Sequence, residues 1–250
     1  MKTFKHSGNT GDIIYSLYAM KGCGQPVTLY IQLDQAADYS GRIHPLGNVM
    51  MNQQMYNMLR PMLLAFNFID DVKVFNGETV DYDLDAFRRS SLILDRGNII
   101  RWYFQIFPEL TNDITKPLIK IKSNTADYIV VQRTERYLNA DVRYKSLNEI
   151  TDEILFLGTK TEYELFIKRV PKAKHYVVTN FYEAMYLISS AKMFIGNQSM
   201  MFAIAEILKV PRAVELFKHC PNVIPAGGIA YDFINEQGLK TILELNGIIK

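Results

Sequence analysis

The chain has 250 residues, of which 48% are hydrophobic and 22% charged, a balance typical of a folded globular protein with one or two domains. Its 28 basic and 26 acidic residues are mixed along the chain and give a net charge of +2, so we expect no nucleic-acid binding. The two cysteines lie far apart and lack metal-ligand spacing, and their number is too low for a disulfide framework.

The amino terminus reads MKTFKHSGNTGD and turns polar within a few residues, so it lacks the apolar core of a signal peptide. No apolar run is long enough to cross a bilayer, and we expect a cytoplasmic protein without a transmembrane segment. The four histidines are scattered without i, i+4 pairing: His6, His44, His175 and His219. We therefore expect no metal site, and we assign no cofactor.

The first half of the chain reads as a mixture of short strands and helices. We expect strands at 2–6, 27–32 and 70–76, and helices at 12–21, 53–66 and 99–107. The segment 80–91 has no clear assignment. Its acidic run DYDLD, at 81–85, is the one rival for a divalent metal, but we favour an edge strand or acidic loop because it lies outside both loops described below.

The second half alternates more regularly between apolar runs and helical patterns. We expect strands at 128–133, 153–158, 175–179, 192–197 and 212–216, with helices at 161–170, 181–191 and 199–209. A polar stretch containing Pro117 separates the halves, and we place a boundary near Ser123, giving domains 1–122 and 123–250. This pattern predicts an α/β protein with two Rossmann-like parallel-sheet domains facing across a cleft.

The stretch HSGNTGDII forms the first strand-to-helix turn of the chain. Its candidate turn or acceptor-side residues are His6, Gly8, Asn9, Thr10 and Gly11. The turn lacks the lysine of a nucleotide-hydrolase phosphate loop and the third glycine of a dinucleotide fingerprint, while its glycines permit positive φ. Two interpretations of Asp12 stay open: it caps the helix, or it faces the cleft as a general base for a substrate hydroxyl.

A second turn, FIGNQSMM, joins a strand to a helix that should begin near Ser199. The free N–H groups and positive dipole end of that helix suit an anion. The candidate donor-phosphate residues are Gly196, Asn197, Gln198, Ser199 and Met200. Alternatively, Asn197 or Ser199 only caps the helix and nothing binds there. Glu206, further along the helix, either accepts ribose hydroxyls or is a solvated or capped acid.

Two arginines follow the first strand of the second half in the stretch QRTERYLN, namely Arg133 and Arg136. The arginine fork suits phosphate oxygens, so both are candidate donor-phosphate ligands. Surface arginines are common in loops, and an ordinary surface position is the alternative. Tyr137 is a candidate contact for the nucleoside.

The motifs GDIIYSLYAMK and AKMFIGNQSMMFAIAEILKVPRAVEL resemble glycosyltransferase family 9, the heptosyltransferase-like proteins of the GT-B fold. RTERYLN, FLGTKTEYELF and NVIPAGG are similar to a compact, poorly characterised branch of that group. The resemblance implies a nucleotide-sugar donor, a carbohydrate or glycan acceptor and, in this shorter chain, a reduced amino-terminal acceptor domain. By the same resemblance, Asp12 matches the acceptor-activating base, and Gly196–Ser199 matches the turn that holds the donor diphosphate.

Two positions and one loop depart from the family pattern. Phe202 stands where the family usually carries a histidine, Asn197 replaces an acidic residue, and the family's lysine-bearing loop is absent, so that Arg133 or Arg136 would take its place. The leading hypothesis is a metal-independent glycosyltransferase with Asp12 as the base. The alternatives are a non-catalytic nucleotide- or sugar-binding module of GT-B ancestry and, on fold analogy alone, a nicotinamide-dependent oxidoreductase.

Overall fold

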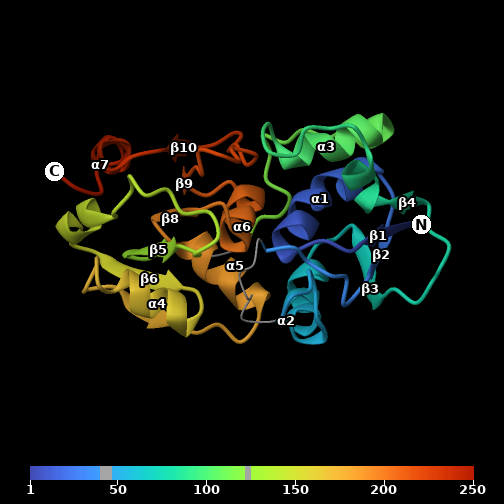
Figure 1. Ribbon diagram of the computed structural model, residues 1–250, viewed down its shortest axis with the longest axis horizontal. Coiled ribbons are helices and arrows are strands. Elements are labelled where there is room, and N and C mark those ends of the chain that lie inside the picture. Colours follow the sequence, from blue (N-terminus) through green and yellow to red (C-terminus); the bar gives the residue numbers. More distant parts are fainter. Residues whose placement is uncertain (40–46, 122–124) are drawn as a thin grey trace. The chain divides into compact units, whose positions relative to one another are not determined.

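The computed structural model describes residues 1–39, 47–121 and 125–250 (Figure 1). The chain divides into two compact units. Unit 1 comprises Met1–Leu94, Asn98–Ile114 and Thr179–Tyr182, and unit 2 comprises Asp95–Gly97, Thr115–Val178 and Glu183–Lys250. The predicted boundary near Ser123 falls outside the described residues, as does His44.

Unit 1 is built on a four-stranded sheet in the order β3-β2-β1-β4, in which all neighbouring strands are parallel. Its strands are β1 (Lys2–His6), β2 (Val27–Ile31), β3 (Ile69–Val74) and β4 (Tyr82–Asp83). The helices are α1 (Thr10–Gly22), α2 (Gln53–Leu63) and α3 (Ile99–Ile106), with short 3-10 helices η1 (Leu84–Arg89) and η2 (Pro108–Leu110). Together, the sheet and helices form an α/β layer structure.

Burial in unit 1 explains why its first turn is held firmly. The inward side chains of β2, Val27, Leu29 and Ile31, are fully buried, as expected for β-branched and aliphatic residues inside a sheet. Helix α1 is buried over most of its length, including Ile13 and Leu17, and it packs against α3. The turn between β1 and α1 is therefore anchored to the core at both ends.

Unit 2 contains a six-stranded sheet in the order β10-β9-β8-β5-β6-β7, again with all neighbouring strands parallel. Its strands are β5 (Tyr128–Gln132), β6 (Glu153–Leu157), β7 (Lys174–Tyr176), β8 (Met193–Asn197), β9 (Arg212–Glu215) and β10 (Ala230–Phe233). The helices are α4 (Lys160–Phe166), α5 (Phe181–Ser190, in unit 2 from Glu183 on), α6 (Met200–Leu208) and α7 (Glu236–Leu245), with the 3-10 helix η3 (Lys145–Glu149). This strand order is that of the doubly wound dinucleotide-binding fold.

Both faces of the unit 2 sheet are buried, which accounts for its continuous apolar runs. On one face, Ile129, Val131, Met193 and Ile195 belong to a core cluster that also includes residues of α4, η3 and α7. Helix α6 packs on β8 and β9, and its residues from Met201 to Leu208 are all buried. The amino-terminal end of α6 is thereby fixed at the carboxyl edge of β8.

The predicted α/β class with two parallel sheets is confirmed, and the predicted strands and helices are found with shifted ends. Helix α1 begins two residues before Asp12, and α4 ends at Phe166, four residues before the predicted end. The uncertain segment 80–91 forms the edge strand β4 and η1, in agreement with the edge-strand interpretation. The strand β10 and helix α7 were not predicted. None of the helices within the described ranges combines the length and apolar character needed to cross a membrane.

Candidate functional site

The strand order of each sheet contains one point where successive connections run in opposite directions. In unit 1 this point lies between β1 and β4, and in unit 2 between β5 and β8. Ligands of open parallel α/β sheets bind beyond the carboxyl ends of the strands at such switch points. The residues that follow these four strands are therefore the first candidates for a functional site.

Asp12 lies in the first turn of α1, the helix that follows β1, and one of its two carboxylate oxygens accepts a hydrogen bond. The Arg88 guanidinium donates to Asp12 Oδ2 at 2.5 Å, whereas Asp12 Oδ1 has no donor among the described residues. The Asp12 side chain is 24% exposed. The interpretation of Asp12 as the N-cap is wrong, because α1 begins at Thr10 and Asn9 occupies the cap position.

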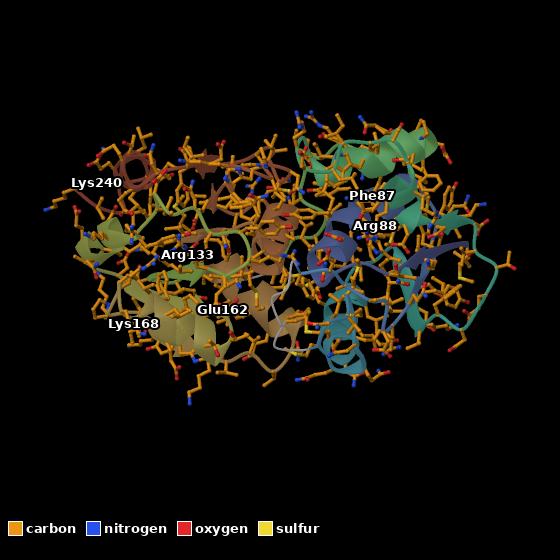
Figure 2. All side chains as sticks on the ribbon, in the orientation of Figure 1. Phe87, Arg88, Arg133, Glu162, Lys168 and Lys240 are labelled. Carbon is orange, nitrogen blue, oxygen red and sulfur yellow. The ribbon has the colours of Figure 1, made fainter. Side chains whose placement is uncertain are left out.

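Arg88 brings a second acid to the same place. Its other terminal nitrogen donates to Asp85 Oδ1 at 2.5 Å, and its guanidinium lies 4.5 Å from the centre of the Phe87 ring (Figure 2). Asp85 also accepts from Lys5 Nζ at 2.8 Å and from the Ser7 backbone N–H at 3.2 Å. Burial opposes ionisation of Asp85, but these positive charges and hydrogen bonds outweigh it and lower its pKa to about 2.

His6 is fully buried and organises the turn behind Asp12. The Gly8 N–H donates to His6 Nδ1 at 2.8 Å, which leaves the proton on Nε2, 2.9 Å from the Tyr103 hydroxyl. That hydroxyl donates to the backbone oxygen of Asp12 at 3.0 Å. Burial lowers the pKa of His6 to about 4, so the ring is neutral at pH 7. With no exposed surface, His6 orients the turn from behind and makes no contact with solvent.

The other turn residues act through space and backbone. Gly8 does not take a positive φ; a Cβ there would collide with the Arg88 guanidinium and lie 2.6 Å from the His6 ring. The turn needs glycine for room, and the expectation of a left-handed backbone at Gly8 and Gly11 is wrong, since Gly11 is helical. Asn9 accepts from the Tyr39 hydroxyl at 2.9 Å, and Thr10 is buried.

Asn197 joins the two strands of the switch point in unit 2. It is the last residue of β8, is fully buried, and its Oδ1 accepts from the Thr134 backbone N–H at 3.0 Å. Its Nδ2 donates to the backbone oxygens of Thr134 at 2.8 Å and Tyr137 at 3.1 Å. The side chain therefore ties the loop after β5 to the turn before α6, and it is occupied by these contacts.

The Gln198 side chain also forms hydrogen bonds within unit 2. Its Nε2 donates to the Cys220 backbone oxygen at 2.8 Å and to Asn222 Oδ1 at 3.0 Å, while its Oε1 accepts from the Phe217 N–H at 2.6 Å. The side chains of Asn197 and Gln198 thus shape the turn, and any phosphate at this turn would meet backbone N–H groups.

Ser199 is the N-cap of α6, as one of the two alternatives anticipated, and its hydroxyl accepts from the Phe202 N–H at 3.4 Å. Ser199 and Met200 are partly exposed at the helix start. The first N–H groups of a helix have no acceptor within the helix, and the positive dipole end lies here. Phe202 is fully buried and packs near Phe194.

Arg136 and Tyr137 lie on the loop that Asn197 holds. The Arg136 side chain is exposed, and its guanidinium lies 4.7 Å from the centre of the Tyr137 ring. Because Asn197 Nδ2 binds the Tyr137 carbonyl, this loop and the start of α6 are held together. The structure thus brings Arg136, Tyr137, Asn197 and Ser199 into one part of unit 2.

The predicted outward position of Arg133 is wrong, because Arg133 forms a buried ion pair with Glu215. Its side chain is 7% exposed, and its guanidinium donates to both oxygens of Glu215 at 2.8 Å. It also donates to the backbone oxygens of Asn139 and Val142 at 3.0 Å. These contacts leave Arg133 to hold the loop after β5.

Glu206 is likewise internal, contrary to the ribose and solvated alternatives. It is 1% exposed, accepts from Arg212 Nε at 2.6 Å and from the Ala226 N–H at 3.0 Å, and pairs with Lys209 at 2.5 Å. Arg212 in turn donates to the backbone oxygens of Ala226 and Gly227. The pair pins the segment around Ala226 to the end of α6.

Sequence reasoning missed Arg88, Asp85 and Tyr103 beside Asp12, and Glu215 beside Arg133. The one available signal was the run of three aspartates followed by two arginines in DYDLDAFRR, since it offers ion-pair partners. The acids of that run are each paired: Asp81 with Lys2, Asp83 with Arg89, and Asp85 with Lys5 and Arg88. Within the described ranges, no cluster of three or more His, Cys, Asp or Glu side chains is arranged to hold a metal ion.

No family model matches the sequence, and no curated protein is similar to it at a significant level. Solved structures, in contrast, are similar over almost the whole chain. E. coli heptosyltransferase WaaC with ADP has a TM-score of 0.59 and 8% identity, and the match covers 98% of this chain and 97% of that chain.

Two further solved structures are similar to this chain to the same degree. The glycosyl transferase family 9 protein from Veillonella parvula has a TM-score of 0.58 and 12% identity over 99% of this chain and 89% of that one. E. coli ADP-heptose LPS heptosyltransferase II has a TM-score of 0.58 and 12% identity over 99% of this chain and 98% of that one. The chain therefore has the fold of glycosyltransferase family 9, in agreement with the resemblance seen in its motifs.

Proposed function

We propose that this chain transfers a sugar from a nucleoside diphosphate sugar to a hydroxyl group of a carbohydrate acceptor. The observation that carries the proposal is the state of Asp12, whose Oδ2 is held by Arg88 while Oδ1 is open, at the switch point of unit 1. A similar structure contains ADP, so an ADP sugar is the first donor to test.

The proposed donor site is the start of α6 in unit 2. Breaking the bond between the anomeric carbon and the diphosphate leaves negative charge on the departing phosphate oxygens. The backbone N–H groups near Met200 and the Arg136 guanidinium would stabilise that charge, and Tyr137 would contact the nucleoside. In this proposal the side chains of Asn197 and Gln198 position the turn, and no metal ion is required.

The proposed base is Asp12. Its open Oδ1 would accept the proton of the acceptor hydroxyl while the hydroxyl oxygen forms the new bond to the anomeric carbon. The nucleoside diphosphate leaves with the electron pair of the broken bond, and the proton stays on Asp12 until it passes to solvent. A positioned base of this kind contributes about 10² to 10⁴ in rate.

The first experiment is a thermal-shift panel of nucleoside diphosphates, their sugars and nicotinamide dinucleotides. A ligand at about a hundred times its dissociation constant adds about 2.7 kcal/mol, which corresponds to roughly 5 to 10 °C for a chain of this size. With the donor identified, Asp12→Asn should abolish transfer and keep donor binding. Asp70→Asn, at an exposed acid of the same unit, is the matched control and should leave both unchanged.

A second candidate is a non-catalytic binding module with the same fold. It is favoured by the internal use of Arg133 and the burial of Phe202, which leave the α6 turn with few polar side chains for catalysis. Donor binding without transfer to any acceptor, unchanged in Asp12→Asn, would select this alternative. Selective stabilisation by nicotinamide dinucleotides would instead contradict both proposals.

A further inference from the structure

Arg88 bridges two carboxylates with the two arms of one guanidinium. One arm donates to Asp12 Oδ2 and the other to Asp85 Oδ1, both at 2.5 Å. The Arg88 side chain is 23% exposed, so the bridge is partly shielded from water. A planar guanidinium presents its donors in a fixed geometry, and a bridge of this type sets the direction of both partners.

The bridge is supported from its inner side. Asp85 is 5% exposed and is held by Lys5 Nζ and by the Ser7 N–H, so the acid that anchors Arg88 is itself fixed by β1 and its turn. The missing side chain at Gly8 leaves the space that the Arg88 and Asp12 termini occupy. Arg88 is therefore anchored by Asp85 and directed at Asp12.

Asp12 is fixed at its backbone as well as its side chain. The Tyr103 hydroxyl donates to the Asp12 backbone oxygen at 3.0 Å, and Arg88 holds Oδ2. Rotation of the carboxylate would break the Arg88 contact, so Oδ1 is kept in one direction. Alignment of a catalytic base to within about 1 Å is what makes it effective.

We propose that Arg88 is the positioning residue of Asp12: anchored by Asp85, it holds Oδ2 and presents Oδ1 to the acceptor hydroxyl. This inference rests on the proposed transferase function. Arg88 does not itself touch the reacting atoms. It acts by restricting Asp12 to the orientation in which proton transfer takes place.

The kinetic test compares Arg88→Gln with Arg89→Gln, which removes the neighbouring arginine from an exposed pair with Asp83 on the same turn. Arg88→Gln should lower kcat by about a hundredfold and change the KM values by less than about twofold, because only the alignment of the base is lost. Arg88→Lys should recover part of the rate, since it keeps the charge but not the fork. Arg89→Gln should match the wild type, and an unchanged kcat in Arg88→Gln would overturn the inference.

A second readout does not depend on transfer activity. Carboxyl groups are labelled with a carbodiimide and an amine, and the rate at each acid is followed by mass spectrometry. Arg88→Gln should raise labelling at Asp12 and Asp85 severalfold, while Arg89→Gln should raise it only at Asp83. Equal labelling of Asp12 in Arg88→Gln and the wild type would overturn the inference.

The two readouts separate the two proposals. A wild-type chain that transfers no sugar, with Asp12 labelling that still depends on Arg88, would defeat the transferase proposal and keep the orientation of Asp12. Circular dichroism and the melting temperature establish that each variant is folded. Should Arg88→Gln fail to fold, Arg88→Lys carries the same comparison.

Discussion

The guanidinium of Arg133 and the carboxylate of Glu215 form a buried pair through two hydrogen bonds of 2.8 Å, one to each carboxylate oxygen. The two residues stand at the carboxyl ends of β5 and β9, with β8 between them in the sheet. Glu215 also accepts from the Asn139 N–H at 2.6 Å. The pair thus closes the carboxyl edge of the unit 2 sheet over the intervening strand.

Glu215→Gln should destabilise the protein by about 3 kcal/mol, because it leaves the buried Arg133 charge without its partner. Chemical denaturation followed by circular dichroism measures this. Lys174→Met breaks the exposed pair with Glu153 in the same unit and should leave the denaturation midpoint in place. A stable Glu215→Gln protein with strengthened nucleotide binding would restore Arg133 as a phosphate ligand.

Asn197→Ala and Arg136→Gln should distinguish how the conformation of the donor turn and the charge beside it contribute to nucleotide affinity. Asn197→Ala removes the hydrogen bonds to the loop after β5, so stability should fall by about 2 kcal/mol along with nucleotide affinity. Arg136→Gln should lower nucleoside diphosphate affinity about tenfold at unchanged stability, since this side chain is exposed. Calorimetric titration measures the nucleotide affinity of each variant, and thermal melts measure its stability. Equal affinities of Arg136→Gln and the wild type would remove Arg136 from the donor site.

Gly196→Ala should be strongly destabilising, by about 2 kcal/mol. An added Cβ would lie 2.5 Å from the backbone oxygen of Gln132 on the neighbouring strand β5, and a paired strand cannot move aside cheaply. Gly8→Ala should cost less in stability, because its obstacles are the ends of the Arg88 and His6 side chains. Its main effect should be on transfer, since it displaces Arg88 from Asp12. Melting temperatures and kcat for the two variants should therefore rank in opposite orders.

Acid should destabilise the protein in two successive pH ranges. The unfolded His6 binds a proton below pH 6.5 but the folded one only near pH 4, so stability is full above pH 6.5 and falls by up to about 3 kcal/mol on acidification to pH 4. The folded Asp85 stays ionised to about pH 2, so its contribution is lost between pH 4 and pH 2. Denaturation midpoints against pH measure both. His6→Asn should be flatter between pH 6.5 and 4, and an equally steep curve would contradict the assignment.

Much of the fold follows from local patterns in the sequence. The run KMFIGN is buried at nearly every position and forms β8, and the serine before MMFAIAEIL caps α6 as capping preferences predict. The four-residue strand β10 was missed because Phe233 is its one buried residue and Asp232 is exposed, so it lacks the apolar run that predicts β5, β6 and β8. Local sequence carries little signal for such a strand.

The contacts of the candidate site were less accessible to sequence reasoning because they join distant positions. Arg88 lies 76 positions after Asp12, and Glu215 lies 82 positions after Arg133. An arginine after a strand has the same local pattern whether it faces solvent or a buried acid. Whether the arginine is buried depends on whether an acid lies next to it, and the order of strands in the sheet determines which residues lie there.

The stretch 216–229 contains neither helix nor strand, yet side-chain hydrogen bonds hold both its first and its last part. Gln198 holds its first part through Phe217, Cys220 and Asn222, and Arg212 holds its last part through Ala226 and Gly227. Freeing this loop therefore requires breaking contacts made by two buried side chains of the core. Opening this loop should therefore cost nearly as much free energy as unfolding unit 2. The Phe217 amide, which donates to Gln198, and the Ala226 amide, which donates to Glu206, should exchange with solvent deuterium at rates closer to those of β8 than to those of a surface loop.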